Sequence, residues 1–346
     1  MRAVVVERFG SAPVIAAVAE PECPPDGAVV RVEATGVCRS DWHAWRGHDA
    51  SVAVPYVPGH EFAGVIDRVG ERVTAFRAGD RVTAPFVFAC GTCAQCLAGD
   101  QQVCPRQQQP GFTLPGSFAE RVVVTHADLN LVALPDAVGF ADAAGLGCRF
   151  ATAYRAVRTR GAVRPDEWVA VHGCGGVGLS AILIARAAGA RVVATDVSDA
   201  ALAAAERLGA HTVAASPTVA DEIRCVTDGG AHVSLDAFGS AATSIASIES
   251  LRPRGRHVQV GLLLAGDAAP PVPMGRVIAD ELDVLGSHGM SALDYPALLA
   301  EIADGRLDPG LARGATIAFD DLPEALSTMD DPERPPGMTV AVTRAA

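Results

Sequence analysis

A glycine-rich run between a strand pattern and a helix pattern constrains the fold of this chain more than any other feature. Residues 168–172 read Trp-Val-Ala-Val-His, which is typical of a buried strand, and the next six residues are Gly-Cys-Gly-Gly-Val-Gly. A helix pattern then runs from Gly178 to Ala188, and a second strand pattern ends at Asp196. Strand, glycine turn, helix and strand in this order predict a parallel, doubly wound sheet.

The alternation of strand and helix patterns is confined to the middle of the chain. Before about residue 150, short extended runs such as 29–32 and 121–124 lie among glycines and prolines, which is typical of a β-rich domain with irregular loops. After residue 288, one helix pattern at 295–303 precedes a closing strand at 338–342. We therefore predict an α/β protein. Residues 1–149 and 289–346 are expected to form the β-rich domain, and residues 150–288 the doubly wound domain.

Length and charge narrow the class of protein. A chain of 346 residues is long enough for two domains. The 28 basic and 40 acidic residues give a net charge of −12, which repels nucleic acid and anionic lipid. No apolar run reaches the roughly 18 residues of a spanning helix, and the first residues do not resemble a secretory signal. We expect a cytoplasmic protein that binds neither nucleic acid nor membrane.

Four of the nine cysteines lie within fifteen residues, at positions 90, 93, 96 and 104. Pairs of cysteines separated by two residues can direct both sulfurs at one ion, and four thiolates complete a closed tetrahedral zinc site. An iron–sulfur cluster is the competing interpretation, because it also takes four thiolates. Seven residues separate Cys96 from Cys104, which is a less typical spacing for an iron–sulfur cluster. Cys90, Cys93, Cys96 and Cys104 are therefore predicted to bind a structural zinc ion.

A second set of metal-binding residue types is dispersed along the chain. Cys38 lies 22 residues before His60, which is followed by Glu61, and Cys148 lies far downstream. Two thiolates and one imidazole would leave a fourth position on zinc open for substrate. Spacing alone does not bring Cys38, His60 and Cys148 together.

The glycine run has the context that a dinucleotide site requires. Its residues are Gly173, Cys174, Gly175, Gly176, Val177 and Gly178. Glycines let the backbone approach a pyrophosphate, whose charge the helix N-terminus favours. Asp196 lies 18 residues beyond Gly178, where a carboxylate binds ribose hydroxyls and repels a 2′-phosphate. We therefore expect NAD rather than NADP.

These motifs resemble those of the medium-chain, zinc-dependent alcohol dehydrogenases over essentially the whole chain. The run Gly59-His60-Glu61-x2-Gly64-x5-Gly70-x2-Val73 matches the zinc signature of that family, and Cys38-Arg39-Ser40-Asp41 matches its first-ligand motif. The resemblance implies a GroES-like catalytic domain, a Rossmann domain, NAD and two zinc ions per chain. It implies that Cys38, His60 and Cys148 hold the catalytic zinc, with Glu61 as a nearby carboxylate that approaches the metal transiently.

The resemblance also implies how the reaction proceeds. Hydride moves between a zinc-bound alkoxide and NAD, giving an aldehyde or ketone reversibly, while Ser40 and His43 relay the proton to solvent. Arg39 is implied to face the cofactor pyrophosphate, and Thr152 to lie near the nicotinamide. Many relatives carry a basic residue before the final strand, where this chain has Gly337-Met338.

The substrate is expected to be a primary or secondary alcohol or the matching carbonyl compound, in a pocket that includes Phe86 and Trp42. Asp49 stands where some relatives have a large aromatic residue. A polyol dehydrogenase of the same superfamily is an alternative, although such enzymes place a carboxylate where this chain has Cys148. A zinc-free quinone reductase would lack the three ligands, and a non-enzymatic zinc-stabilised scaffold would need no relay.

A homodimer or homotetramer is expected, with the strand at 282–286 as the candidate sheet edge.

Overall fold

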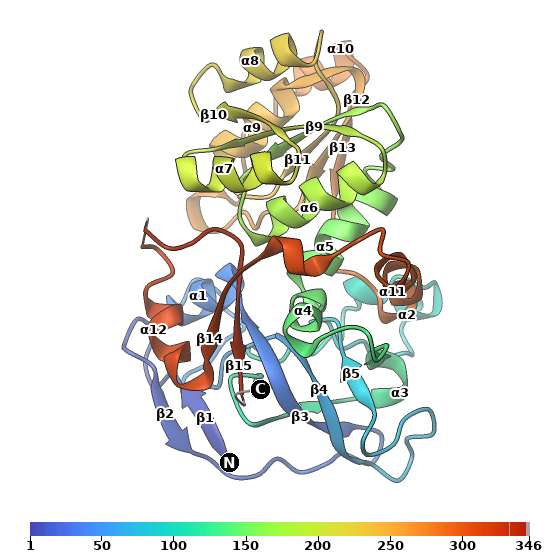
Figure 1. Cartoon of the computed structure of the whole chain (residues 1–346), viewed down its shortest axis with the longest axis vertical. Helices are drawn as coiled ribbons and strands as arrows, with labels where there is room; N and C mark the ends of the chain where they lie inside the picture. The colour runs from blue at the N-terminus through green and yellow to red at the C-terminus, as the bar shows by residue number, and fades with distance from the viewer. Residues whose placement is uncertain (332, 344–346) are drawn as a thin grey trace.

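The computed structural model describes residues 1–331 and 333–343, and its two main sheets lie in opposite halves of an elongated molecule (Figure 1). The upper sheet has six parallel strands in the order β10-β9-β8-β11-β12-β13. Its strands are β8 (Trp168–His172), β9 (Arg191–Asp196), β10 (His211–Ala214), β11 (Ala231–Asp236), β12 (Leu251–Gln259) and β13 (Asp283–Gly286). Its helices are α6 (Gly176–Ala187), α7 (Asp199–Arg207), α8 (Val219–Val226), α9 (Ala241–Glu249) and α10 (Met274–Ala279). The predicted doubly wound sheet is confirmed.

The lower half is built on a seven-stranded sheet of mainly antiparallel strands. Its strands are β3 (Ala28–Val37), β4 (Glu61–Val69), β5 (Arg81–Thr83), β6 (Arg121–Val124), β7 (Val132–Ala133), β14 (Arg313–Ala318) and β15 (Met338–Val342). A separate pair consists of β1 (Arg2–Val5) and β2 (Val14–Ala17). The helices of this half are α1 (Arg39–Trp45), α2 (Ala94–Leu97), α3 (Ala127–Asn130), α4 (Phe140–Ala144), α11 (Tyr295–Ala303) and α12 (Leu322–Ser327).

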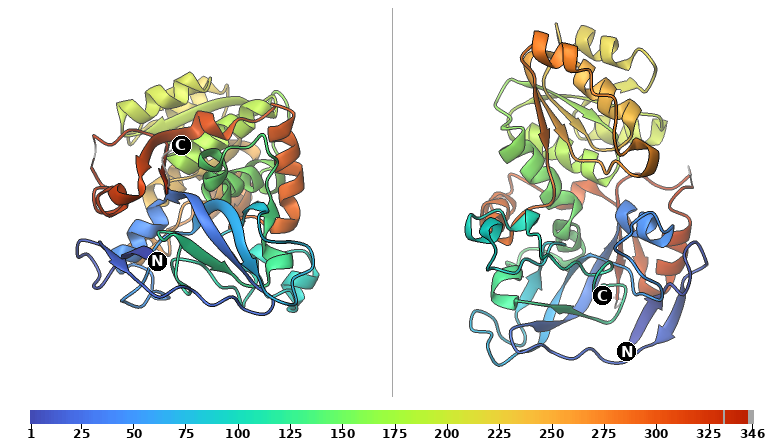
Figure 2. Two further views of the ribbon diagram at one scale, coloured as in Figure 1. Left: turned by 60° about the horizontal axis from the view of Figure 1, so that its bottom comes forward. Right: turned by 180° about the vertical axis from the view of Figure 1, so that it is seen from behind.

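The end of the chain returns to the lower half, as the sequence predicts. Strand β15 pairs antiparallel with β3, with Val340 opposite Gly36. Figure 2 shows the red end of the chain in the same half of the molecule as the blue N-terminal segment. All six strands of the upper sheet come from residues 168–286, and β14 and β15 complete the lower sheet. On this division of strands we propose that the domain boundaries lie at 149/150 and 288/289.

The two halves are joined by an apolar core that includes α5 (Arg149–Arg155) and α6, which lie between the sheets in Figure 1. One cluster of buried side chains contains Leu146 and Phe150 near the start of α5 and Ile182 of α6. Leu146 and Phe150 are fully buried, so the start of α5 is held on both sides. The segment that begins α5 therefore has a fixed position between the two halves.

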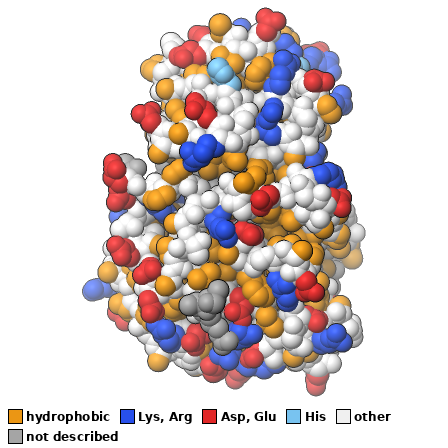
Figure 3. All heavy atoms as spheres, in the orientation of Figure 1, with side chains coloured by type: hydrophobic (Ala, Val, Ile, Leu, Met, Phe, Trp, Pro, Cys, Tyr) orange, Lys and Arg blue, Asp and Glu red, His pale blue; other side chains and the backbone are white. Residues whose placement is uncertain are grey.

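The face in Figure 3 mixes acidic and basic side chains, with no extended field of one sign. Among the described residues, no helix has both the length and the apolar character needed to cross a membrane. The predicted edge strand is also found, since β13 ends the six-stranded sheet.

Two histidines on strands of the upper sheet, His172 on β8 and His257 on β12, are buried, and we expect them to make the stability of the fold sensitive to acid. Burial lowers the pKa of His172 to about 3 and that of His257 to about 4. Both rings are neutral when folded, whereas an unfolded histidine binds a proton below about pH 6.5. Stability is therefore complete above that pH and falls as the pH decreases towards 4, by about 3 kcal/mol for each histidine.

This prediction is checked by the urea midpoint of unfolding between pH 7 and pH 4.5. A variant with both His172→Asn and His257→Asn is expected to have a flatter pH profile than the wild type, whatever its stability at pH 7. The variant and the wild type contain the same cysteines, so any loss of stability from protonation of the thiols is the same in both proteins and does not affect the comparison. Identical slopes would contradict the assignment to these two rings.

Candidate active site and zinc lobe

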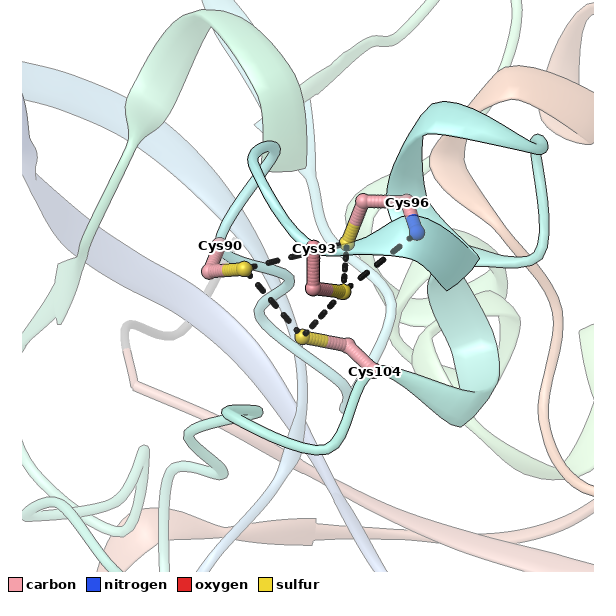
Figure 4. A group of neighbouring side chains, drawn as sticks. All are labelled: Cys90, Cys93, Cys96 and Cys104. Atoms are coloured by element: carbon pink, nitrogen blue, oxygen red, sulfur yellow. Dashed lines mark hydrogen bonds between the residues drawn. The ribbon is translucent and has the colours of Figure 1, made fainter.

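The four clustered cysteines converge in one lobe, around α2 (Figure 4). Sulfurs at the corners of a zinc tetrahedron lie about 3.8 Å apart when each Zn–S bond is ~2.3 Å. In the lobe, Cys93 Sγ lies 3.4 Å from Cys96 Sγ and 3.8 Å from Cys104 Sγ, and Cys90 Sγ lies 3.6 Å from Cys104 Sγ. No disulfide links these sulfurs. The donor set fits one closed tetrahedral zinc ion, with no position left for a substrate.

A second donor cluster forms where the two halves meet. The side chains of Cys38, His60, Glu61 and Cys148 bring one ligand atom each within 4.8 Å of the others. Cys38 follows β3, and His60 immediately precedes β4, whose first residue is Glu61. Cys148 precedes α5. The structure thus brings together the dispersed residues of the predicted catalytic set.

The chemistry of this cluster fits a divalent metal. His60 is 1% exposed, and its Nε2 atom is buried without a hydrogen-bond partner among the described residues. A buried polar atom without a partner costs about 1–3 kcal/mol, so a missing ligand is the simplest explanation. The neighbouring Cys148 and His60 side chains hold the pKa of Cys38 well below its usual range despite burial. An anionic sulfur beside an imidazole is the state that a metal requires.

Asp41 orients the cluster, a role that the sequence did not reveal. Its Oδ1 accepts hydrogen bonds from Nδ1 of His60 (2.9 Å) and from the backbone N–H of Gly59 (3.1 Å), and its Oδ2 accepts from the backbone N–H of Cys38 (3.0 Å). Burial opposes a charge on His60, but Asp41 and Cys38 together outweigh it and raise the pKa of the ring. With Nδ1 donating to Asp41, Nε2 is left to face the cluster. The only signal in the sequence was the position of Asp41 within the Cys38–Asp41 motif.

Asp41→Asn is expected to weaken zinc binding at this cluster by about 10–100-fold, because a partner that orients a ligand is lost. Competition with a chromophoric chelator measures the affinity of each zinc ion. Asp67→Asn is the matched control, since Asp67 lies near the far end of β4 and pairs there with Arg121 of β6. Equal zinc affinities in the wild type and Asp41→Asn would rule out this role.

Glu61 is bound to Arg149, a residue for which no role was predicted. The Arg149 backbone N–H and its Nε each donate to Glu61 Oε1 at 2.9 Å, and Nε also lies 2.9 Å from Oε2. A further contact joins an Arg149 terminal nitrogen to Glu61 Oε2, and that nitrogen also donates to Thr339 O. The Glu61 and Arg149 side chains are 0% and 6% exposed. Gly36 leaves room for the pair, since a Cβ there would lie 2.1 Å from Glu61 Oε2. The transient approach of Glu61 to a metal stays a prediction.

The predicted dinucleotide loop lies between β8 and α6. Gly173 has a φ of +95°, and a Cβ on Gly178 would lie 1.8 Å from the Gly173 carbonyl oxygen, so both positions require glycine. At the end of β9, Asp196 accepts hydrogen bonds from the backbone N–H groups of Cys174 (2.7 Å) and Ser198 (2.9 Å). Gly175 is the N-cap of α6, and Gly176 and Val177 are its first residues.

The other predicted residues surround these two sites. Ser40 and His43 share helix α1, and Cys38 Sγ lies 3.8 Å from Ser40 Oγ. No hydrogen bond joins Ser40 to His43 in the described part of the chain. The Arg39 guanidinium pairs with Asp330 and lies over Trp42. Thr152 is buried on α5, and its Oγ1 has no hydrogen-bond partner among the described residues.

Of the predicted pocket residues, Phe86 lies near His60. The ring of Phe86 lies 6.1 Å from that of His60, and the ring of Phe112, which the sequence did not single out, lies 5.4 Å from it. Asp49 Oδ1 instead accepts hydrogen bonds from Ser51 in its own loop. Aromatic side chains thus form an apolar wall beside the donor cluster.

Comparison with known proteins identifies the family. Residues 24–136 match the family described as alcohol dehydrogenase GroES-like domain, and residues 176–304 match zinc-binding dehydrogenase. An alcohol dehydrogenase of Geobacillus stearothermophilus is 35% identical over 89% of this chain and 90% of its own, and one of Rhizobium meliloti is 38% identical over 89% of each. The structure of the alcohol dehydrogenase TADH from Thermus sp. ATN1 superposes with a TM-score of 0.91 at 33% identity, covering 99% of this chain and 100% of the other. With the expected motifs present in the expected order, the chain belongs to the medium-chain, zinc-type alcohol dehydrogenase family of oxidoreductases.

Proposed function

We propose that this enzyme is a zinc-dependent, NAD-linked alcohol dehydrogenase that holds its catalytic metal with Cys38, His60 and Cys148. The observation that carries the proposal is the buried Nε2 atom of His60, which has no partner among the described residues and lies within a cluster of two thiols and a carboxylate. Zinc, when bound, supplies a Lewis acid that lowers the pKa of an alcohol hydroxyl, and NAD supplies the hydride acceptor.

The chain's own residues would bind, orient and deprotonate the substrate. Ser40 lies on α1 near Cys38 and would accept the proton of the substrate hydroxyl, which His43 would pass on towards solvent. The Phe86 and Phe112 rings flank His60 and exclude water from the reacting atoms. Primary and secondary alcohols and their carbonyl products are the proposed substrates.

The cofactor would be held by the glycine loop and by residues around it. Backbone N–H groups of the glycine loop and the first turn of α6 (Gly173 to Gly178) would bind the pyrophosphate, and Asp196 would bind the adenosine ribose. Arg39 would face the pyrophosphate once its pairing with Asp330 is exchanged for the phosphate charge. Thr152, with its unpartnered hydroxyl, would lie beside the nicotinamide.

Metal analysis and a substrate screen test this proposal together. Purified protein is expected to carry one zinc ion for each of its two donor clusters and to reduce NAD with short, branched or aromatic alcohols. Polyols belong in the screen, because a polyol dehydrogenase is the nearest alternative. A single zinc ion per chain with no activity towards any alcohol would favour a zinc-stabilised scaffold instead.

The Asp196 carboxylate predicts the cofactor preference. Asp196→Ala is expected to lower kcat/KM for NAD about tenfold or more, through loss of charge-assisted hydrogen bonds, while removing the repulsion of NADP. Because Asp196 also binds the N–H groups of Cys174 and Ser198, Asp196→Asn is the matched variant that removes the charge and keeps an acceptor. The ratio of kcat/KM for NAD to that for NADP should fall in both variants. An unchanged ratio would show that another residue selects the cofactor.

The proposal extends to assembly and location. We propose a homodimer or homotetramer in the cytoplasm, in which the β13 edge of the six-stranded sheet pairs with its counterpart in a second copy. Val284 on this strand is 45% exposed, which is consistent with an edge that another subunit covers.

A further inference from the structure

Two imidazole rings are in direct contact at the end of α1, beyond the predicted relay. His43 Nδ1 lies 3.0 Å from His48 Nδ1, which is hydrogen-bond distance. The contact is fixed locally, since the backbone N–H of His48 donates to the carbonyl of His43 (2.9 Å). The Trp42 ring packs edge-on against both imidazoles, with centroid distances of 5.0 Å and 5.6 Å. His48 therefore has a defined position next to the last residue of the relay.

The two rings differ in their access to water. His43 is partly buried, whereas His48 is exposed at the surface. Burial, His48 and Arg39 together lower the pKa of His43, against a weaker opposing effect of Cys38 and Asp330. A proton on His43 is thus readily given up, and the nearest ring that can accept it is His48.

The Nδ1–Nδ1 contact imposes a chemical constraint on the pair. A neutral imidazole carries one N–H group and one acceptor nitrogen. A hydrogen bond between two Nδ1 atoms therefore requires one ring to carry its proton on Nδ1 and the other on Nε2. When His43 has its proton on Nδ1, its Nε2 is free to accept a proton from the site, and Nε2 of His48 carries a proton that faces away from the contact.

We propose that His48 is the solvent end of the proton relay, an inference that rests on the proposed function. During alcohol oxidation a proton binds Nε2 of His43, the Nδ1 proton of His43 crosses to Nδ1 of His48, and the Nε2 proton of His48 leaves to water or to a buffer base. One proton enters and one leaves, so the pair keeps its charge. Carbonyl reduction reverses each transfer. Between turnovers, exchange of the ring protons with water returns both rings to their starting tautomers, since His48 is exposed and His43 is only partly buried.

Stopped-flow kinetics with a pH-indicator dye tests this path in the zinc-loaded enzyme. His48→Gln retains a hydrogen-bonding side chain but cannot carry a proton onwards. At low buffer concentration, proton release is expected to slow about tenfold relative to the wild type. This loss is smaller than the ~100-fold or more that removal of a general acid or base usually causes, because His43 remains in place. Added imidazole should restore the rate, because a free base then accepts the proton of His43 directly. His211→Ala is the control, since His211 is an exposed histidine on the distant strand β10.

Two kinetic outcomes would overturn the proposal. Proton release in His48→Gln at the wild-type rate, at every buffer concentration, would show that His43 delivers protons to water alone. A loss of rate that imidazole does not restore would show that His48 acts only by supporting α1. Failure of the wild type to oxidise any alcohol is a separate result, which overturns the proposed function and the relay with it.

Nitrogen NMR of histidine-labelled, cofactor-free enzyme gives a readout that does not depend on turnover. The wild type is expected to show complementary tautomers, with one of the two rings protonated at Nδ1 and the other at Nε2. His48→Ala should release His43 from this coupling and change its nitrogen shifts, while His211→Ala should not. Two uncoupled rings, both protonated at Nε2 in the wild type, would contradict the shared proton.

Discussion

Cys38→Ala is expected to lower alcohol-dependent NAD reduction about a thousandfold or more and to remove one zinc ion per chain. The loss follows from removal of a ligand that lies within 4.8 Å of the His60 and Cys148 donors. A bound metal contributes several kcal/mol to stabilising the developing charge, and about 4 kcal/mol corresponds to a thousandfold in rate. Elemental analysis and initial rates of NADH formation, measured on the same sample, give both quantities.

Cys225→Ala is the matched control for this experiment. Cys225 is exposed on α8 in the upper half and belongs to neither donor cluster. Its replacement should leave metal content and turnover unchanged. Full activity in Cys38→Ala would eliminate the proposed mechanism, whereas retained zinc with lost activity would separate metal binding from catalysis.

Arg149→Met is expected to lower the free energy of unfolding by about 3–5 kcal/mol, because it leaves the Glu61 carboxylate buried without its partner. Glu61 is 0% exposed. Arg149 donates to both carboxylate oxygens of Glu61, and its one other hydrogen bond goes to the Thr339 carbonyl. Burial already raises the pKa of Glu61 against the opposing charge of Arg149, so loss of that charge should drive the carboxyl towards its neutral form. Urea denaturation at neutral pH measures the change.

The double variant Glu61→Gln/Arg149→Met tests whether the cost arises from the unpaired charge. Removal of both charges should recover part of the lost stability, since no buried ion remains. Arg254→Met is the control, because its pair with Glu281 is 78% and 70% exposed. Exposed pairs contribute only about 0–1 kcal/mol. An Arg149→Met protein as stable as this control would show that the buried pair is dispensable.

Local patterns predicted the elements that lie in the interior of the sheets. The strands at 168–172, 191–196 and 338–342 and the helix at 295–303 occur within the bounds that the apolar patterns gave. The three strands bury most of their length, and the helix buries Tyr295, Leu298 and Leu299 at helical spacing, so these sequences carry a strong apolar signal. Strand β10 (His211–Ala214) was missed, because it lies at a sheet edge and only its third residue is buried.

The two metal sites differ in whether the spacing of their ligands along the chain could predict them. The lobe could be predicted from the residues, because a short loop forces nearby thiols together. The convergence of Cys38, His60 and Cys148 depends on how β3, β4 and α5 pack, and only the family resemblance indicated it. The roles of Asp41 and Arg149 were not predicted, since each depends on the direction of one side chain in the folded protein.

The pairing of β15 with β3 has a consequence for the order in which the protein is made. The six-stranded sheet is complete once residue 286 has left the ribosome, whereas the lower sheet lacks β14 and β15 until residue 342 is available. Because folding during synthesis proceeds from the N-terminus and by domains, the upper half can fold while the lower half still exposes the edge of β3. Truncation before β15 (Met338–Val342) would therefore leave the edge of β3 open, and an open strand edge promotes aggregation.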